Sequence, residues 1–185
     1  MSVHEWAALD EGERGELVDG VLEEEEMADF VHDLVVAWLI SLVGPWVFAR
    51  GGLAAASDAK LGVAEDRGRK PDACFYLPGA AKPEARGLVT KPPTIVVEVV
   101  SPTPRDARRD RVEKLPEYAS FGVLYYWIVD PQLRTFEALE LGADGRYVHT
   151  VAATGGRSAA PGCDGLVIDL DELWRLVDEL SADTA

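Results

Sequence analysis

Hydrophobic and polar residues alternate along the chain with two different periods, and these periods predict where helices and strands form. Near the start, residues 15–27 contain two short apolar runs, ELV and VL, on either side of Asp19-Gly20. An Asp-Gly pair between two strands favours a tight two-residue turn. We therefore expect an N-terminal β-hairpin.

A helical period follows in residues 30–43, where apolar side chains recur every three to four positions. Asp29 stands directly before this run and is a suitable N-cap. The Gly-Pro pair at positions 44–45 is typical of a helix end. We expect one helix that stops there, followed by short strands near residues 46–49 and 54–60.

The middle of the chain is predicted to alternate between loops and strands. Residues 64–70 carry alternating charges and residues 78–93 are rich in Gly, Pro and Lys, so both segments are predicted to be loops. Residues 73–77 between them have the composition of a strand. Residues 94–101, with the sequence TIVVEVVS, are the most apolar strand, which is typical of a strand buried on both faces.

The remaining segments complete an α/β pattern. They predict a charged helix at 105–121, a buried strand at 124–129, two hairpin strands at 135–141 and 147–152, and a strand remnant with a short helix at 166–180. This order favours one domain, residues 1–185, with a central mixed sheet flanked by helices, over a repetitive βαβ array.

Charge narrows the kinds of nucleic-acid contact that are compatible with the sequence. The formal net charge is −15, and the acidic residues concentrate in residues 10–26 and 164–183. This balance argues against a protein that coats DNA tightly. A local basic stripe still allows a weak, transient contact with DNA that depends on salt and divalent cations. Its members are Arg105, Arg108, Arg109, Arg111 and Lys114.

Cysteine usage and the absence of targeting features suggest a location. The apolar runs fall short of the roughly 20 residues needed to cross a bilayer, and the first residues lack the features of a signal peptide. We expect a cytoplasmic protein without membrane association. Cys74 and Cys163 lie far apart in the sequence, so buried free thiols are expected rather than a zinc or redox site.

Glu98 is the most informative candidate for chemistry, because it interrupts the apolar strand at residues 94–101. Burying a carboxylate costs several kcal/mol or more unless a cation, a proton or hydrogen bonds compensate. Two interpretations follow. Glu98 binds a functional cation, or it has a structural role, paired with an arginine in the core or placed at a sheet edge.

Asp72 strengthens the first interpretation. It opens the strand at residues 73–77, which could lie beside the strand of Glu98. Two carboxylates that converge at one sheet edge suit Mg²⁺, which binds one or two carboxylates, keeps several waters and accepts a phosphate oxygen. On its own, Asp72 after Pro71 is also compatible with ordinary turn chemistry. Side chains on opposite faces of the sheet would exclude a shared site.

Lys114 is the third candidate, with Asp110 and Tyr118 one turn away on the same helix face. Its ammonium could orient or help deprotonate water and offset charge on a phosphate. The alternative is a solvated basic face. Pro116 predicts a kink or a helix restart, which affects the direction of the lysine. His32 has two interpretations as well, a metal ligand or general base, and a half-buried helix histidine with a carboxylate or backbone partner.

These residues resemble a known family. Pro71-Asp72, the segment EVVSP from Glu98, and Lys114 followed by EYASFGVLYYWIVDP resemble the Uma-type restriction endonucleases of the PD-(D/E)XK nuclease superfamily. GELVDGVL is similar to the family's N-terminal hairpin, His32 to a histidine that opens its first long helix, and GLVIDLDELW to its closing segment.

The resemblance implies a restriction-endonuclease-like core and a metal-dependent reaction. Asp72 and Glu98 would bind Mg²⁺ or Mn²⁺, with the backbone carbonyl of Val99, and Glu16 would lie beside the metal. In the superfamily's basic motif a lysine stands two residues after the glutamate, where this chain has Val100. The Uma-type pattern moves that role to the following helix, where Lys114 is the matching position.

Three functions follow from these interpretations. The first is a DNA endonuclease that hydrolyses phosphodiester bonds with metal-activated water, with Asp72, Glu98 and Lys114 as catalytic residues and a homodimer as the assembly. The second is a non-catalytic protein on the same fold, which has a degenerate site and acts as a binding or interaction module. A purely structural dimerisation module is the third, and it leaves Glu98 unexplained.

Overall fold

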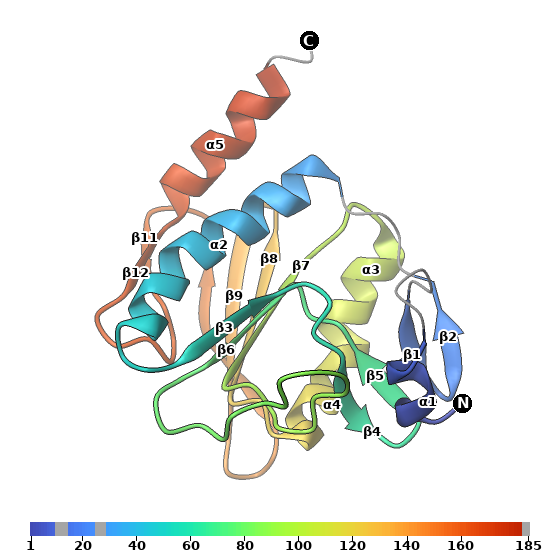
Figure 1. The fold of residues 1–185 in the computed structure, drawn as a ribbon. Helices are drawn as coiled ribbons and strands as arrows, with labels where there is room; N and C mark the ends of the chain where they lie inside the picture. Colours follow the sequence, from blue (N-terminus) through green and yellow to red (C-terminus); the bar gives the residue numbers. More distant parts are fainter. Residues whose placement is uncertain (10–14, 25–28, 183–185) are drawn as a thin grey trace.

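The computed structural model describes residues 1–9, 15–24 and 29–182 and is built around a six-stranded mixed sheet (Figure 1). The inner strands β7 and β8 run parallel, and the other neighbours in this sheet pair antiparallel. In spatial order the strands are β10 (Tyr147–Ala153), β9 (Thr135–Leu141), β8 (Tyr125–Asp130), β7 (Ile95–Val99), β6 (Ala73–Tyr76) and β3 (Leu53–Ala56).

Helices cover both faces of this sheet. On one face, α2 (Phe30–Phe48) and α5 (Leu170–Ala182) pack against the larger core cluster. On the other face lies a continuous helical segment (Figure 1), made of α3 (Pro104–Arg108), the π-helical turn η1 (Arg109–Glu113) and α4 (Lys114–Phe121). A two-stranded sheet of β11 (Arg157–Ala159) and β12 (Val167–Asp169) precedes α5. This arrangement confirms the predicted α/β class with a central mixed sheet flanked by helices.

A second, four-stranded sheet lies beside α4 (Figure 1) and contains the predicted N-terminal hairpin. Asp19 and Gly20 both have positive φ, at 49° and 75°, as the tight hairpin turn requires. The short helix α1 (Val3–Ala7) packs on this sheet through Trp6. In spatial order the strands are β2 (Val21–Glu23), β1 (Glu16–Val18), β5 (Arg67–Arg69) and β4 (Leu61–Ala64).

The predicted end of the first long helix is wrong. Asp29 caps α2 by accepting a hydrogen bond from the His32 amide, as expected, but the helix continues through the Gly-Pro pair to Phe48. Gly44 has no Cβ for the Pro45 ring to meet, which reduces the usual penalty on a helical residue before proline. Val47 is fully buried, so packing favours the extra turn. The strand predicted at 46–49 is therefore the last turn of this helix.

Within the described residues, α2 is also one helix whose length and composition would suffice to cross a membrane. The sequence expectation that no apolar run approaches a membrane span is wrong for this helix on those two criteria. Its Val35, Leu39, Val43 and Val47 side chains pack in the core against the sheet, which is how the core helix of a globular domain behaves.

The charged segment at residues 64–70 is not a loop throughout as predicted, because it contains the end of β4, a turn and the strand β5. β4 and β5 form a hairpin in which Gly62 pairs with Gly68, and β5 also pairs with β1. The segment at 78–93 contains one isolated bridge, Leu61 to Val89, and no named strand, as predicted. Cys74 and Cys163 are buried free thiols, which confirms that expectation.

Replacing Gly68 with Ala should lower the free energy of unfolding by about 1–3 kcal/mol. A Cβ atom at position 68 would lie 2.2 Å from the buried Trp6 ring, whose indole nitrogen donates to the Gly15 carbonyl. The paired Gly62→Ala is the control, because its Cβ would meet only the Leu88 side chain at 3.1 Å or more. Thermal unfolding of both variants tests this, and equal melting temperatures would contradict it.

Candidate functional site

The two predicted carboxylates lie on the same face of the central sheet. Ala73 pairs with Val97 in antiparallel register, and continuing this register by one residue would place Asp72 opposite Glu98. Residues opposite each other in antiparallel strands point to the same face. Glu98 also shares its face with Val96, which belongs to the core cluster below α4. A metal site shared by Asp72 and Glu98 therefore stays a prediction.

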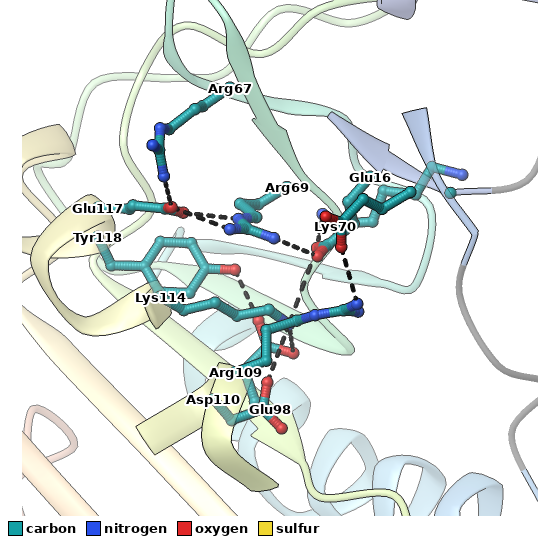
Figure 2. A network of polar contacts seen from close by, with 12 residues as sticks. Glu16, Arg67, Arg69, Lys70, Glu98, Arg109, Asp110, Lys114, Glu117 and Tyr118 are labelled. Carbon is teal, nitrogen blue, oxygen red and sulfur yellow. Dashed lines mark hydrogen bonds and ion pairs between the residues drawn. The ribbon is translucent and has the colours of Figure 1, made fainter. Parts of the chain in front are cut away.

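Lys114 reaches this face from the first residue of α4 (Figure 2). Its Nζ lies 2.9 Å from Glu98 Oε2, 3.1 Å from Asp110 Oδ1 and 3.8 Å from Glu16 Oε1. The Tyr118 hydroxyl donates to the other Glu98 oxygen at 2.6 Å. Glu98 and Lys114 are 3% and 5% exposed, so this cluster is almost entirely removed from water.

The local helix geometry explains how Lys114 points inward. The turn η1 has π-helical hydrogen bonding and ends at Glu113, directly before Lys114. Pro116, the third residue of α4, has no N–H to donate to the carbonyl four residues earlier. The predicted restart with Pro116 as the first helical residue is wrong, because α4 begins at Lys114. Asp110, Lys114 and Tyr118 share one buried face, as the sequence predicted.

An arginine that sequence analysis missed connects the hairpin to this helix (Figure 2). Arg69 on β5 is 0% exposed. It donates to Glu16 at 2.7 Å and to both carboxylate oxygens of Glu117 at 2.6 and 2.9 Å. Arg67 binds Glu117 as well. These contacts connect α4 to the second sheet. They also hold Glu16 close to Lys114, so the N-terminal hairpin is part of the candidate site.

Asp72 is held from two directions. The backbone amide of Val99 donates to its Oδ2 at 2.7 Å, and His32 Nε2 lies 3.1 Å from its Oδ1. His32 therefore has the carboxylate partner that one of the two interpretations expected. Its Nδ1 lies 3.6 Å from Asp33 and is a buried nitrogen with no hydrogen-bond partner among the residues that the structure describes. The Val99 carbonyl as a metal ligand stays a prediction.

Burial and the mutual charges set the protonation of the cluster. Burial raises the pKa of Glu98 well above its usual value, although Lys114 opposes this shift. Burial also raises the pKa of Asp110, again opposed by Lys114. For Glu16, burial is outweighed by Lys114 and Arg69, so its pKa is lowered. The cluster thus lowers the pKa of Glu16 and raises that of Glu98.

The basic group in the cluster stays charged. Burial would lower the pKa of Lys114, but Asp110, Glu16 and Glu98 outweigh it and raise the pKa well above the usual value. A lysine held this way is a poor proton acceptor. Of the two roles expected for Lys114, the arrangement favours charge compensation over the deprotonation of water.

The donor set fits a hard divalent cation. Four carboxylates raise the pKa of Lys114, namely those of Glu16, Asp72, Glu98 and Asp110. Carboxylates therefore outnumber the ammonium group in this cluster. Oxygen ligands of this kind suit Mg²⁺, which needs only one or two carboxylates and keeps several waters. Within the described residues, no group of three or more His, Cys, Asp or Glu side chains is placed so that it could hold a metal ion. Asp72 and Glu98 are the pair that could hold an open site.

The structure also places three other residues that were considered from the sequence. Val100, at the superfamily's usual lysine position, is buried in the apolar cluster, and Lys114 supplies the ammonium instead. Arg111 binds Asp130 and Glu137 and has a structural role in the sheet. Arg108 forms an ion pair with Glu113 in the same helical segment.

The fold and the cluster together define a protein of the nuclease-fold class, in which a mixed α/β core brings two carboxylates and a lysine to one sheet face. Residues 2–171 match the model of the Uma2 family, described as "Putative restriction endonuclease". The chain belongs to this family, which confirms the resemblance found in the sequence. Family membership supports a nuclease.

A solved structure has the same fold. It is a crystal structure described as that of "a putative nuclease belonging to DUF820 from Anabaena variabilis ATCC 29413". The match has a TM-score of 0.72 and 16% sequence identity, and it covers 95% of this chain and 98% of the other. No curated protein sequence matches the chain.

Proposed function

We propose that this protein is a DNA endonuclease that depends on Mg²⁺ or Mn²⁺, with Asp72 and Glu98 as the metal-binding carboxylates and Lys114 as the catalytic cation. The observation that carries the proposal is Glu98. It is buried in the central sheet, lies opposite Asp72, and contacts a lysine and a tyrosine rather than a core arginine. Membership of the Uma2 family supports the same reaction class.

The metal would supply Lewis-acid chemistry at the phosphodiester and lower the pKa of the attacking water. The chain's own residues have separate tasks. Lys114 offsets negative charge at the scissile phosphate. Tyr118 orients Glu98 through the hydrogen bond to Oε1, and burial keeps the pKa of its hydroxyl well above the usual value, so it stays a donor.

His32 and the Val99 amide position Asp72. Partners of this kind fix the orientation of ligating groups and affect metal affinity. Glu16 lies next to Lys114 and, when charged, adds to the attraction for a divalent cation. The cytoplasmic location, the homodimer and the absence of membrane association stay predictions.

A second function, a non-catalytic binding module on the nuclease fold, is favoured by two observations. The net charge of −15 opposes DNA binding, and the Lys114 ammonium forms an ion pair with Glu98 at 2.9 Å. A DNA cleavage assay distinguishes the two functions, because only the nuclease cleaves DNA when a divalent cation is supplied.

Supercoiled plasmid DNA should be nicked and linearised by the wild type with Mg²⁺ or Mn²⁺, and EDTA should abolish the reaction. Asp72→Asn removes one of the two carboxylates, so we expect its cleavage rate to fall at least about 100-fold, with a higher Mn²⁺ concentration needed for half-maximal rate. Asp164→Asn, at an exposed position, is the matched control and should cleave as the wild type does. A folded wild type without metal-dependent cleavage would leave the binding module as the function.

A further inference from the structure

Two arginines of the basic stripe converge on one acidic residue of the N-terminal hairpin. Arg105 in α3 donates to Glu23 Oε2 at 2.9 Å, and Arg109 in η1 donates to the same oxygen at 3.3 Å. Glu23 is the last residue of β2. We name these three side chains the Glu23–arginine contact. It joins segments more than 80 residues apart in the chain.

This contact lies next to the candidate site. Across the hairpin Glu23 pairs directly with Glu16, whose carboxylate is 3.8 Å from Lys114. Opposed residues of an antiparallel pair have Cα atoms only about 4.5–5.5 Å apart. Arg109 directly precedes Asp110, another of the carboxylates that contact Lys114. Figure 2 shows the Arg109 side chain beside the cluster.

The chemistry of the contact is that of an anion site. Guanidinium groups carry fixed donors that match the oxygens of carboxylates and phosphates alike. Two of them directed at one oxygen would bind a phosphodiester oxygen in the same way. We propose that Arg105 and Arg109 bind a backbone phosphate of the substrate DNA, and that the Glu23 carboxylate occupies this phosphate site until DNA displaces it.

Arg105 and Arg109 differ from the other arginines near the site because their carboxylate partner, Glu23, can be displaced more easily. Arg69 is fully enclosed between Glu16 and Glu117. The Glu23 side chain, in contrast, is 34% exposed and that of Arg105 is 63% exposed, whereas the Arg109 side chain is 8% exposed. Exposed ion pairs such as Glu23–Arg105 are weak and screened by salt, so a phosphate can compete with Glu23 for Arg105.

The proposal also gives the acidic composition a specific role. Glu23 begins the run Glu23–Glu26, which the sequence places among the acidic residues of the N-terminal part. An internal carboxylate on the phosphate site lowers affinity for DNA in general. Binding is then confined to low salt or to DNA that makes further contacts. The inference rests on the proposed function, because it assigns a substrate subsite to that same site.

Binding of a short fluorescein-labelled DNA duplex, measured by fluorescence anisotropy in EDTA, tests the proposal. Glu23→Gln removes the competing charge and should tighten binding about three- to tenfold at low salt. Glu24→Gln is the matched control, because this neighbour is exposed and the substitution changes the net charge equally. We expect less than a twofold change for it.

A double-mutant cycle separates the arginine site from general electrostatics. Adding Arg105→Gln to Glu23→Gln should abolish the gain, whereas Arg105→Gln alone should change affinity less. The logarithm of the association constant for DNA, plotted against the logarithm of the salt concentration, should have a slope steeper by about 1 for Glu23→Gln than for the wild type. In the double variant this slope should return to the wild-type value. Circular dichroism melts confirm that the variants fold.

Two results would overturn the proposal. One is equal tightening by Glu23→Gln and Glu24→Gln, and the other is a double variant that keeps the full gain. Because EDTA removes metal-dependent cleavage from this measurement, its failure is distinct from failure of the proposed function. A wild type that cleaves plasmid with Mg²⁺ but shows no Glu23 effect loses only the arginine site. A Glu23 effect without any cleavage supports the arginine site in a binding module.

Discussion

Replacing Lys114 with Met should lower the free energy of unfolding by about 3–5 kcal/mol, because it leaves buried carboxylates without their cation. The Lys114 ammonium contacts Glu98, Asp110 and Glu16, and all three are buried. Removing one partner of a buried charge group is costly since the remaining charges cannot regain water. For a domain of this size, such a loss corresponds to a melting temperature lower by about 6–20 °C.

The pH dependence of this loss has a definite sign. Burial raises the pKa of Glu98 and of Asp110 in the folded protein, so their contribution to stability is present at low pH and is lost as pH rises through the folded-state pKa. Without Lys114 both groups should hold their protons to higher pH. The stability difference between Lys114→Met and the wild type should therefore be smaller at pH 5 than at pH 8.

Thermal or urea unfolding at the two pH values measures this difference. The matched control is Lys82→Met, an exposed lysine whose loss changes the net charge equally and should change stability by no more than about 0.5 kcal/mol. If Lys114→Met unfolds at the temperature of the control, the ammonium is not the group that compensates the buried carboxylates, and a metal or bound protons must do so.

The centre of the candidate site could be predicted because it follows from strand periodicity. A carboxylate inside the apolar run of β7 is visible in the sequence, and Asp72 opens the neighbouring β6. The antiparallel pairing then places both on one face. The lysine was found from helical spacing and family resemblance. Its direction was not predictable, since the π-helical turn η1 changes the register of the helix before Pro116.

The surrounding polar network could not be predicted from the sequence. Arg69 stands in a segment of alternating charges, which is typical of a solvated loop, and yet it is fully buried. Only the pairing of β5 with β1 and the packing of α4 bring Glu16 and Glu117 to it. Contacts between residues about 50 positions apart leave no periodic signal in the chain.

The prediction of where α2 ends is wrong for a related reason. Local signals at the Gly-Pro pair favour a stop, but the buried face of α2 continues to Val47 against the sheet. Tertiary packing outweighs a local preference of this size. Helix ends and ion-pair partners are thus set by the assembled fold, whereas the strand pattern that carries Glu98 is set locally.

Glu98→Gln should separate function from stability. If Glu98 binds the catalytic metal, its amide analogue should reduce the Mg²⁺-dependent cleavage rate at least about 1,000-fold, which corresponds to about 4 kcal/mol of transition-state stabilisation. Stability should change little or rise. The carboxylate is buried and its pKa is raised, so the neutral amide avoids a desolvation cost while still accepting the Tyr118 hydrogen bond.

Plasmid cleavage and thermal unfolding of the same preparation test both halves of this expectation. Glu172→Gln, at an exposed position of α5, is the matched control and should keep wild-type cleavage and stability. The two interpretations of Glu98 then lead to opposite results. If Glu98 is only the structural partner of Lys114, its substitution should destabilise the fold as Lys114→Met does, and the molecules that remain folded should still cleave DNA. If Glu98 holds the metal, the variant melts at or above the wild-type temperature and is inactive. The negative charge of Glu98 is then required for metal binding and cleavage but not for the stability of the fold.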